Sequence, residues 1–183
     1  MPAPSSTGTG PTYHPCVTIF EPTLEALNHA AVRYVVVGGV AVVLHGYARF
    51  TADLDLVVDL SPTESSKAIE ALVALGLQPM SPVDPMTFAD ETTRARWIEE
   101  KGMMVFSLFD PADPLRRVDV FVDNPIDFEQ LWARSETVAL GTTTARIASI
   151  EDLVKMKRIS DRPQDRLDIQ ALETIAEERD PGG

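Results

Sequence analysis

Two aspartates placed two positions apart, Asp53 and Asp55, have the spacing that metal-assisted phosphate chemistry needs. The segment 53–59 reads as a strand, and alternate strand residues project to one face, so the two carboxylates should lie roughly 6.5 Å apart. Neighbouring anions repel, which raises the pKa of at least one of them unless a cation compensates. Hard oxygen ligands favour Mg²⁺ or Mn²⁺ over zinc. The alternative interpretation is a solvated strand face without a ligand.

A third carboxylate, Asp119, lies in a second apolar strand. In the run RVDVFV at 117–122 the valines occupy one face and Asp119 the other. An unpaired carboxylate in such a strand is costly. If the two strands are neighbours, three carboxylates meet, and such a group can hold divalent ions that bridge phosphate oxygens and activate a hydroxyl. This arrangement predicts transfer of a phosphoryl or nucleotidyl group.

Residues suited to phosphate binding flank the first pair of aspartates. Gly38 and Gly39 end a buried strand, and glycine lets the backbone and the first amides of a following helix approach an anion. Arg49 and Thr51 offer a guanidinium and a hydroxyl. A glycine pair is also common in a plain turn, and Arg49 could equally pair with a surface carboxylate.

One further cation, Lys157, is aimed inward by the apolar spacing of the helix expected at 150–159. Its functional interpretation is a contact with a triphosphate, and the alternative is a lysine stem that keeps its ammonium in water. Residues 141–166 carry six basic and four acidic side chains, so an anionic ligand should favour this side. Asp165 and Asp168 are expected to organise these bases through ion pairs.

Helices and strands alternate along the chain, which predicts an α/β (α+β) fold with a small mixed sheet flanked by helices. Strands are expected at 34–37, 53–59, 103–109, 118–122 and 143–147, with a turn at 110–114 and a loop at 78–90. Helices are expected at about 22–31, 40–47, 62–76, 91–101, 128–133, 150–159 and 163–178. The expected organisation is a mobile N-terminal tail at 1–20, a single domain at 21–178 and a C-terminal tail at 179–183.

Composition narrows the classes of function. The chain has 183 residues, 44% apolar, and one cysteine, Cys16, so neither an internal disulfide nor a cysteine-based zinc site is expected. It lacks a run of eighteen apolar residues and a signal-peptide pattern, which predicts no membrane span and a cytoplasmic location. A net charge of −12 argues against indiscriminate nucleic-acid binding.

The ordered motifs Gly38-Gly39, Asp53-Leu-Asp55 and Asp119 resemble the signature of the DNA polymerase beta-like nucleotidyltransferase superfamily. The phrases YVVVGGVAVVLHGYARFTADLDLVV and IASIEDLVKMKRISDRPQDRLDIQAL are similar to those of small bacterial and archaeal nucleotidyltransferase-like proteins related to AbiEii-type toxins. The similarity spans nearly all of 21–178. It implies the polymerase beta-like fold, with Asp53 and Asp55 holding Mg²⁺ or Mn²⁺.

The resemblance also implies roles for the remaining site residues. Asp119 would complete the metal site and help activate an acceptor hydroxyl, the glycine pair would receive the triphosphate, and Lys157 matches the lysine of the helix after the sheet. The implied reaction transfers NMP from an NTP to an acceptor that is a tRNA, a protein or a small molecule. A toxin role with an antitoxin partner is one expectation. The alternatives are a nucleotide- or partner-binding module, such as an antitoxin-like subunit with little turnover, and a metal-dependent phosphohydrolase.

Overall fold

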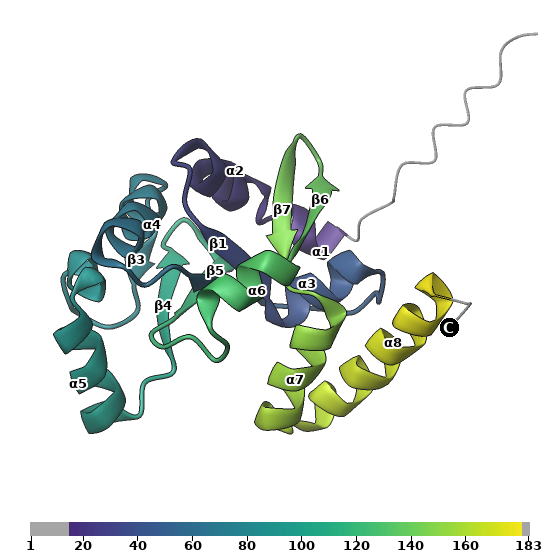
Figure 1. Cartoon of the computed structure of the whole chain (residues 1–183). Coiled ribbons are helices and arrows are strands. Elements are labelled where there is room, and N and C mark those ends of the chain that lie inside the picture. The colour runs from purple at the N-terminus through teal and green to yellow at the C-terminus, as the bar shows by residue number, and fades with distance from the viewer. Residues whose placement is uncertain (1–14, 181–183) are drawn as a thin grey trace, which may run out of the picture.

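Residues 15–180 of the chain are described by a computed structural model (Figure 1). The strands are β1 Tyr34–Val37, β2 Asp53–Val58, β3 Gln78–Pro79, β4 Val105–Asp110, β5 Asp113–Phe121, β6 Glu136–Leu140 and β7 Thr143–Ile147. The helices are α1 Pro15–Thr18, α2 Glu21–His29, α3 Gly38–His45, α4 Pro62–Ala74, α5 Glu91–Lys101, α6 Phe128–Arg134, α7 Ile150–Ser160 and α8 Pro163–Arg179, with the 3-10 helix η1 at Pro85–Ala89. One sheet in the order β3-β4-β5-β2-β1-β7-β6 confirms the predicted α/β class with a mixed sheet and flanking helices.

The two aspartate-bearing strands are neighbours, which is the arrangement that the prediction of a three-carboxylate site depended on. β2 runs parallel to β5, and Asp55 stands opposite Asp119 while Asp53 stands opposite Arg117. β1 lies on the other side of β2 and runs antiparallel to it, with Val37 opposite Asp55. The three carboxylates therefore belong to one face of the sheet, which we call the acid face.

The opposite face of β2, β5 and β4 is apolar and fully covered. Its residues alternate with those of the acid face and include Leu54, Leu56, Val118, Phe106 and Leu108, all buried. The ring of Phe106 stacks on Trp97 of α5 and packs against Phe88 of η1. Burial of large apolar side chains drives this packing, so this face forms the core that fixes the strand register.

The acid face is covered at one end only. α3 packs on β1 and β2 and against α7 and α8, which lie side by side at one end of the molecule, whereas α4 and α5 lie at the other end (Figure 1). On β4, alternate residues of the acid face such as Ser107 and Phe109 stay half-buried. The aspartates thus lie where the helical cover ends and the open part of the face begins.

Several boundaries differ from the sequence expectations. Residues 15–20, expected in the mobile tail, form α1 and its link to α2, and both Val17 and Phe20 are fully buried. The rest of that expected tail, 1–14, lies outside the described residues, as do 181–183 of the expected C-terminal tail. α3 begins at the glycine pair itself, and α8 continues to Arg179.

Other differences concern pairing that only the tertiary structure reveals. The expected loop at 78–90 contains the short edge strand β3 and the helix η1. The expected turn at 110–114 shrinks to two residues, because β4 and β5 extend toward each other as a hairpin. β6 was not predicted, and it forms because the chain folds back antiparallel onto β7. Among the described residues, no helix has the length and apolar character that crossing a membrane requires.

Candidate active site

The parallel register of β2 and β5 brings Asp55 and Asp119 opposite each other on the acid face. The Asp119 side chain is 11% exposed, and its buried Oδ1 has no hydrogen-bond partner among residues 15–180. Burial, together with the charges of Asp119 and Asp53, raises the pKa of Asp55 to about 7, against the lowering influence of Lys157 and Arg162. This part of the sheet is therefore short of positive charge.

Asp53 differs from the other two carboxylates because it is held by an arginine. Nη2 of Arg117 lies 2.7 Å from Oδ2 of Asp53 and 3.8 Å from Oδ2 of Asp119. Burial still raises the pKa of Asp53 above its ordinary value, since it outweighs the attraction of Arg117. No role for Arg117 was predicted from the sequence. The signal was its position two residues before Asp119, which places both side chains on one face of β5.

Carboxylate oxygens on the acid face suit a hard divalent cation, and the unpartnered oxygen of Asp119 is the kind of group that such an ion satisfies. As the side chains lie, the described residues contain no group of three or more His, Cys, Asp or Glu side chains arranged to hold a metal ion. The Asp53 carboxylate is instead engaged by Arg117. The metal-binding roles of Asp53, Asp55 and Asp119 stay predictions.

The glycine pair is required by close packing against the site. Gly38 has φ +64°, in the left-handed region, and a Cβ atom there would overlap the carboxylate of Asp55. A Cβ atom on Gly39 would overlap the hydroxyl of Thr51 and the guanidinium of Arg49. The pair also opens α3, whose N-cap Val37 provides no side-chain hydrogen bond to the first-turn amides. Backbone donors at this end of the helix thus lie directly beside Asp55.

The predicted cations Arg49 and Lys157 meet at one buried carboxylate. Asp168 of α8 is fully buried, with Oδ2 2.6 Å from Nζ of Lys157 and Oδ1 3.1 Å from Nε of Arg49. Gln164 donates a further hydrogen bond to Oδ1. Arg49 therefore pairs with a buried carboxylate, and Lys157 is buried rather than extended into water.

Asp165 is the second carboxylate of this cluster. It accepts hydrogen bonds from Nζ of Lys157, the hydroxyl of Ser160 and the backbone N–H of Arg162. Burial alone would raise the pKa of Asp165, but these hydrogen bonds together hold it below its ordinary value. The expectation that Asp165 and Asp168 organise the bases through ion pairs is met for Lys157 and Arg49.

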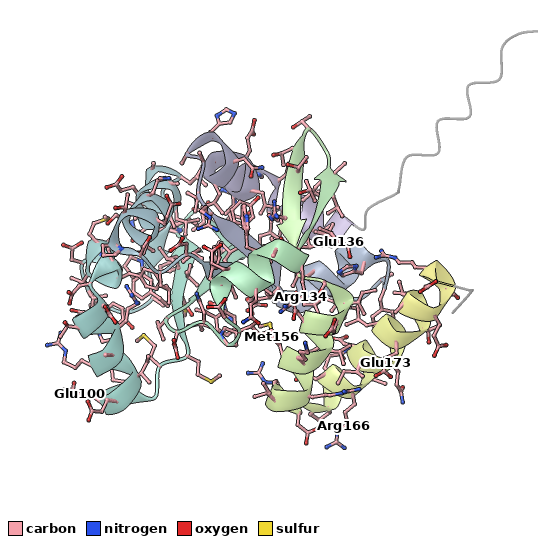
Figure 2. All side chains as sticks on the ribbon, viewed as in Figure 1. Glu100, Arg134, Glu136, Met156, Arg166 and Glu173 are labelled. Atoms are coloured by element: carbon pink, nitrogen blue, oxygen red, sulfur yellow. The ribbon has the colours of Figure 1, made fainter. Side chains whose placement is uncertain are left out.

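The helix that carries Lys157 is fixed at its start by a separate ion pair. Ser149 caps α7 by accepting a hydrogen bond from the backbone N–H of Asp152. The buried carboxylate of Asp152 receives two hydrogen bonds from Arg134 of α6, at 2.9 and 2.8 Å. Arg134 lies beside the first turn of α7, Arg166 lies near the start of α8, and Glu173 lies where α8 adjoins α7 (Figure 2). The position of Lys157 is thus set by polar contacts at both ends of α7.

The eight predicted site residues form one connected group. Gly38 adjoins Asp55, Gly39 adjoins Thr51 and Arg49, and Arg49 reaches Lys157 through Asp168. Asp119 and Asp53 complete the group through the strand register and Arg117. A separate cavity of about 350 Å³ lies beyond the C-terminal ends of β2 and β5. It is lined by Leu60, Ser61, Pro62, Glu91, Arg94, Ala95, Ile98, Val122 and Asp123.

Solved structures share this fold, and three of them illustrate the similarity. A lincomycin-bound lincosamide antibiotic adenylyltransferase, LnuA, is 18% identical with a TM-score of 0.58, and the match covers 86% of this chain and 96% of that one. ANT(2")-Ia in complex with adenylyl-2"-tobramycin is 14% identical, with a TM-score of 0.56 and coverages of 86% and 87%. An antigenic nucleotidyltransferase-like protein from Paracoccidioides brasiliensis is 16% identical, with a TM-score of 0.55 and coverages of 85% and 74%. The fold is that of the polymerase beta-like nucleotidyltransferases.

The family of the chain follows from its sequence. Residues 17–179 match the family model described as "Nucleotidyltransferase of unknown function (DUF6036)", and the chain belongs to that family. The enzyme class predicted from the sequence, a nucleotidyltransferase, is thereby confirmed at the level of family and fold. No curated protein matches the chain. The AbiEii-type relationship is not part of these findings and stays a prediction.

Proposed function

We propose that this protein transfers a nucleoside monophosphate from an NTP to an acceptor hydroxyl, with Mg²⁺ or Mn²⁺ as the cofactor. The observation that carries the proposal is the placement of Asp55 between Gly38 and Asp119. The backbone amides that open α3 lie on one side of Asp55, and the unpartnered carboxylate oxygen of Asp119 lies on the other. Asp53, Asp55 and Asp119 would hold the metal, which when bound supplies positive charge to phosphate oxygens.

The chain's own residues have distinct roles in this reaction. The amides at the start of α3 bind the triphosphate, since the N-cap side chain supplies no acceptor to them and they lie at the positive end of a helix. An ammonium has three N–H donors, and Asp165 and Asp168 engage two of those of Lys157, which leaves one for a phosphate oxygen. Arg49 and Thr51 adjoin Gly39 and so lie beside the same amides.

Asp119 is the general base. One oxygen of its carboxylate would hold the metal and the other takes the proton of the acceptor hydroxyl, whose oxygen forms a bond to the α-phosphorus while the bond to the bridging oxygen breaks and pyrophosphate leaves. The net charge of −12 and the acidic site favour a small hydroxylated acceptor over an RNA. The similar solved structures contain lincomycin and an adenylylated tobramycin. A tRNA or protein acceptor, a toxin role, an antitoxin partner and a cytoplasmic location stay predictions.

The first test is thermal unfolding with each NTP, with and without Mg²⁺, for the native chain and for Asp55→Asn. A ligand at about a hundred times its dissociation constant adds about 2.7 kcal/mol to the free energy of unfolding, which shifts Tm by a few degrees. We expect a Mg²⁺-dependent shift that the variant lacks. Absence of any shift in the native chain would contradict the proposal.

The second test follows label into product. With a mixture of small hydroxylated metabolites and antibiotics as acceptors, α-labelled NTP should transfer label and γ-labelled NTP should not. Release of inorganic phosphate without transfer of the α-label would instead identify a phosphohydrolase. Nucleotide binding without either product would identify a binding module.

A further inference from the structure

Arg117 occupies the acid face together with all three carboxylates. It stands opposite Asp53 in the register of β2 and β5 and two residues before Asp119 on the same strand. Nη2 of Arg117 is 2.7 Å from Asp53 and 3.8 Å from Asp119, so one nitrogen serves two of the predicted metal ligands. The guanidinium therefore contributes a positive charge among the carboxylates.

The way in which Arg117 is held differs from a structural ion pair such as Arg134 with Asp152. Arg134 donates two hydrogen bonds to a fully buried carboxylate. Arg117 donates one hydrogen bond to Asp53, its side chain is 40% exposed, and its buried Nε has no hydrogen-bond partner within residues 15–180. Bidentate pairs fix an arginine firmly, and a pair through one nitrogen does so less.

The charges on the acid face show why Arg117 matters. Counted by formal charge, the three carboxylates and one guanidinium carry −2 together, whereas without Arg117 the carboxylates alone would carry −3. A divalent cation that binds Asp53 competes with Arg117 for the same carboxylate. A guanidinium that loses this carboxylate then lies beside the metal site with its donors available to a phosphate.

We propose that Arg117 is a positioning residue that acts as the counter-ion of the carboxylates until a divalent cation binds, and then becomes a ligand of the NTP phosphates. The inference rests on the proposed nucleotidyl transfer. It predicts opposite effects of removing Arg117: tighter binding of the metal alone and weaker binding of the nucleotide. A purely structural arginine would not separate the two, because disordering the site weakens both.

The test measures binding of Mn²⁺ alone by electron paramagnetic resonance, at about pH 8, above the raised pKa of Asp55. For Arg117→Gln we expect the Mn²⁺ dissociation constant to fall about tenfold, as the loss of one neighbouring charge implies. With saturating Mn²⁺, the dissociation constant of a non-hydrolysable ATP analogue should rise about tenfold, as expected for a lost charge-assisted hydrogen bond. Arg117→Lys, which keeps the charge, should stay close to the native chain in both measurements.

Arg116→Gln is the matched control, because Arg116 pairs with Asp110 at 2.9 Å rather than with the three carboxylates. It should leave both constants unchanged. Unchanged or weakened Mn²⁺ binding by Arg117→Gln would overturn the inference, as would unchanged nucleotide binding. A different result would instead overturn the proposed function itself: a native chain that binds no Mn²⁺, or Mn²⁺ binding that persists undiminished in Asp55→Asn.

Discussion

Lys157 and Asp168 form a buried ion pair in which Nζ of the lysine lies 2.6 Å from Oδ2 of the aspartate. The other oxygen of Asp168 is 3.1 Å from Nε of Arg49, which precedes β2. One carboxylate of α8 thus anchors two cations that come from distant parts of the chain. Because both cations lie within the proposed nucleotide site, Asp168 links the stability of the C-terminal helices to the geometry of that site.

Replacing Asp168 with Asn should lower the free energy of unfolding by about 3 kcal/mol, because two buried or half-buried cations lose their shared counter-charge. Urea unfolding measures this effect. Glu173→Gln is the matched control, since Glu173 also joins α8 to a base of α7, but through the exposed pair with Arg158. That change should cost less than about 1 kcal/mol. Equal effects of the two substitutions would show that Asp168 is not a special anchor.

Asp55→Asn should abolish nucleotidyl transfer and at the same time stabilise the metal-free protein. Asp55 is a buried carboxylate placed beside two others, and its neutral isostere removes both the cost of burying the charge and the repulsion from Asp119 and Asp53. We expect an increase of about 1 kcal/mol in the free energy of unfolding, of the size seen when functional residues are neutralised. Denaturant unfolding in the presence of a chelator measures it. A less stable, inactive variant would indicate that the loss of activity came from damage to the fold.

Gly38→Ala should destabilise the protein by more than the cost of placing an alanine at the positive φ angle of Gly38. Alanine at φ +64° costs about 1 kcal/mol, and the added Cβ would also displace the Asp55 carboxylate, for a total of roughly 3 kcal/mol. Gly102→Ala is the control, because Gly102 has φ +60° and a Cβ added there would meet no atom within 4 Å. The difference in Tm between the two variants isolates the contact with Asp55. Equal losses of stability would mean that this contact is easily relieved.

His45 should make the protein less stable as the solution becomes acidic. Burial lowers the pKa of His45 below 6.5, while the hydrogen bond to Ala148 and the charge of Glu136 oppose this shift and Arg179 adds to it. Arg179 can only donate, so Nδ1 accepts from it and Nε2–H donates to the Ala148 carbonyl.

The sign of the pH effect follows from proton binding. Between the lowered folded pKa and 6.5 the unfolded chain binds more protons, so the contribution of His45 is complete above pH 6.5 and is lost as the pH falls through this window. His45→Gln, which retains a donor for Ala148, should flatten the dependence of the free energy of unfolding on pH. Substituting the exposed His29 should not flatten it. An unchanged slope in His45→Gln would refute the assignment.

The sequence was sufficient to predict the placement of a site residue where its chemistry and the periodicity of its helix or strand agree. The adjacency of the strands bearing Asp55 and Asp119 could be inferred because an unpaired carboxylate in a strand of valines costs free energy unless a ligand or partner compensates it. The inward aim of Lys157 could be predicted from the apolar stripe of its helix, although not the identity of its partners. Strands whose own residues carry no clear pattern could not be predicted: β6 forms a hairpin with β7, which follows it after two residues, and the two-residue β3 pairs with β4 much further along the chain.

Arg117 shows a different limit of sequence reasoning. Its position two residues before Asp119 was visible, but its contact with Asp53 depends on the parallel register of β2 and β5. The same holds for Arg49, whose partner Asp168 lies on the last helix. In both cases the residue type indicated a role for a cation, and only the tertiary structure shows which carboxylate it meets.

The anchoring of Arg49 by Asp168 bears on the order in which the site matures on the ribosome. Both strands that carry the acids, β2 and β5, leave the ribosome well before α7 and α8, so the three acids emerge before Lys157 and before Asp168. A nascent or prematurely terminated chain that lacks α8 has Asp53, Asp55 and Asp119 but lacks the Asp168 carboxylate that pairs with Arg49. Incomplete translation products are therefore expected to lack nucleotidyl transfer activity altogether rather than to retain part of it.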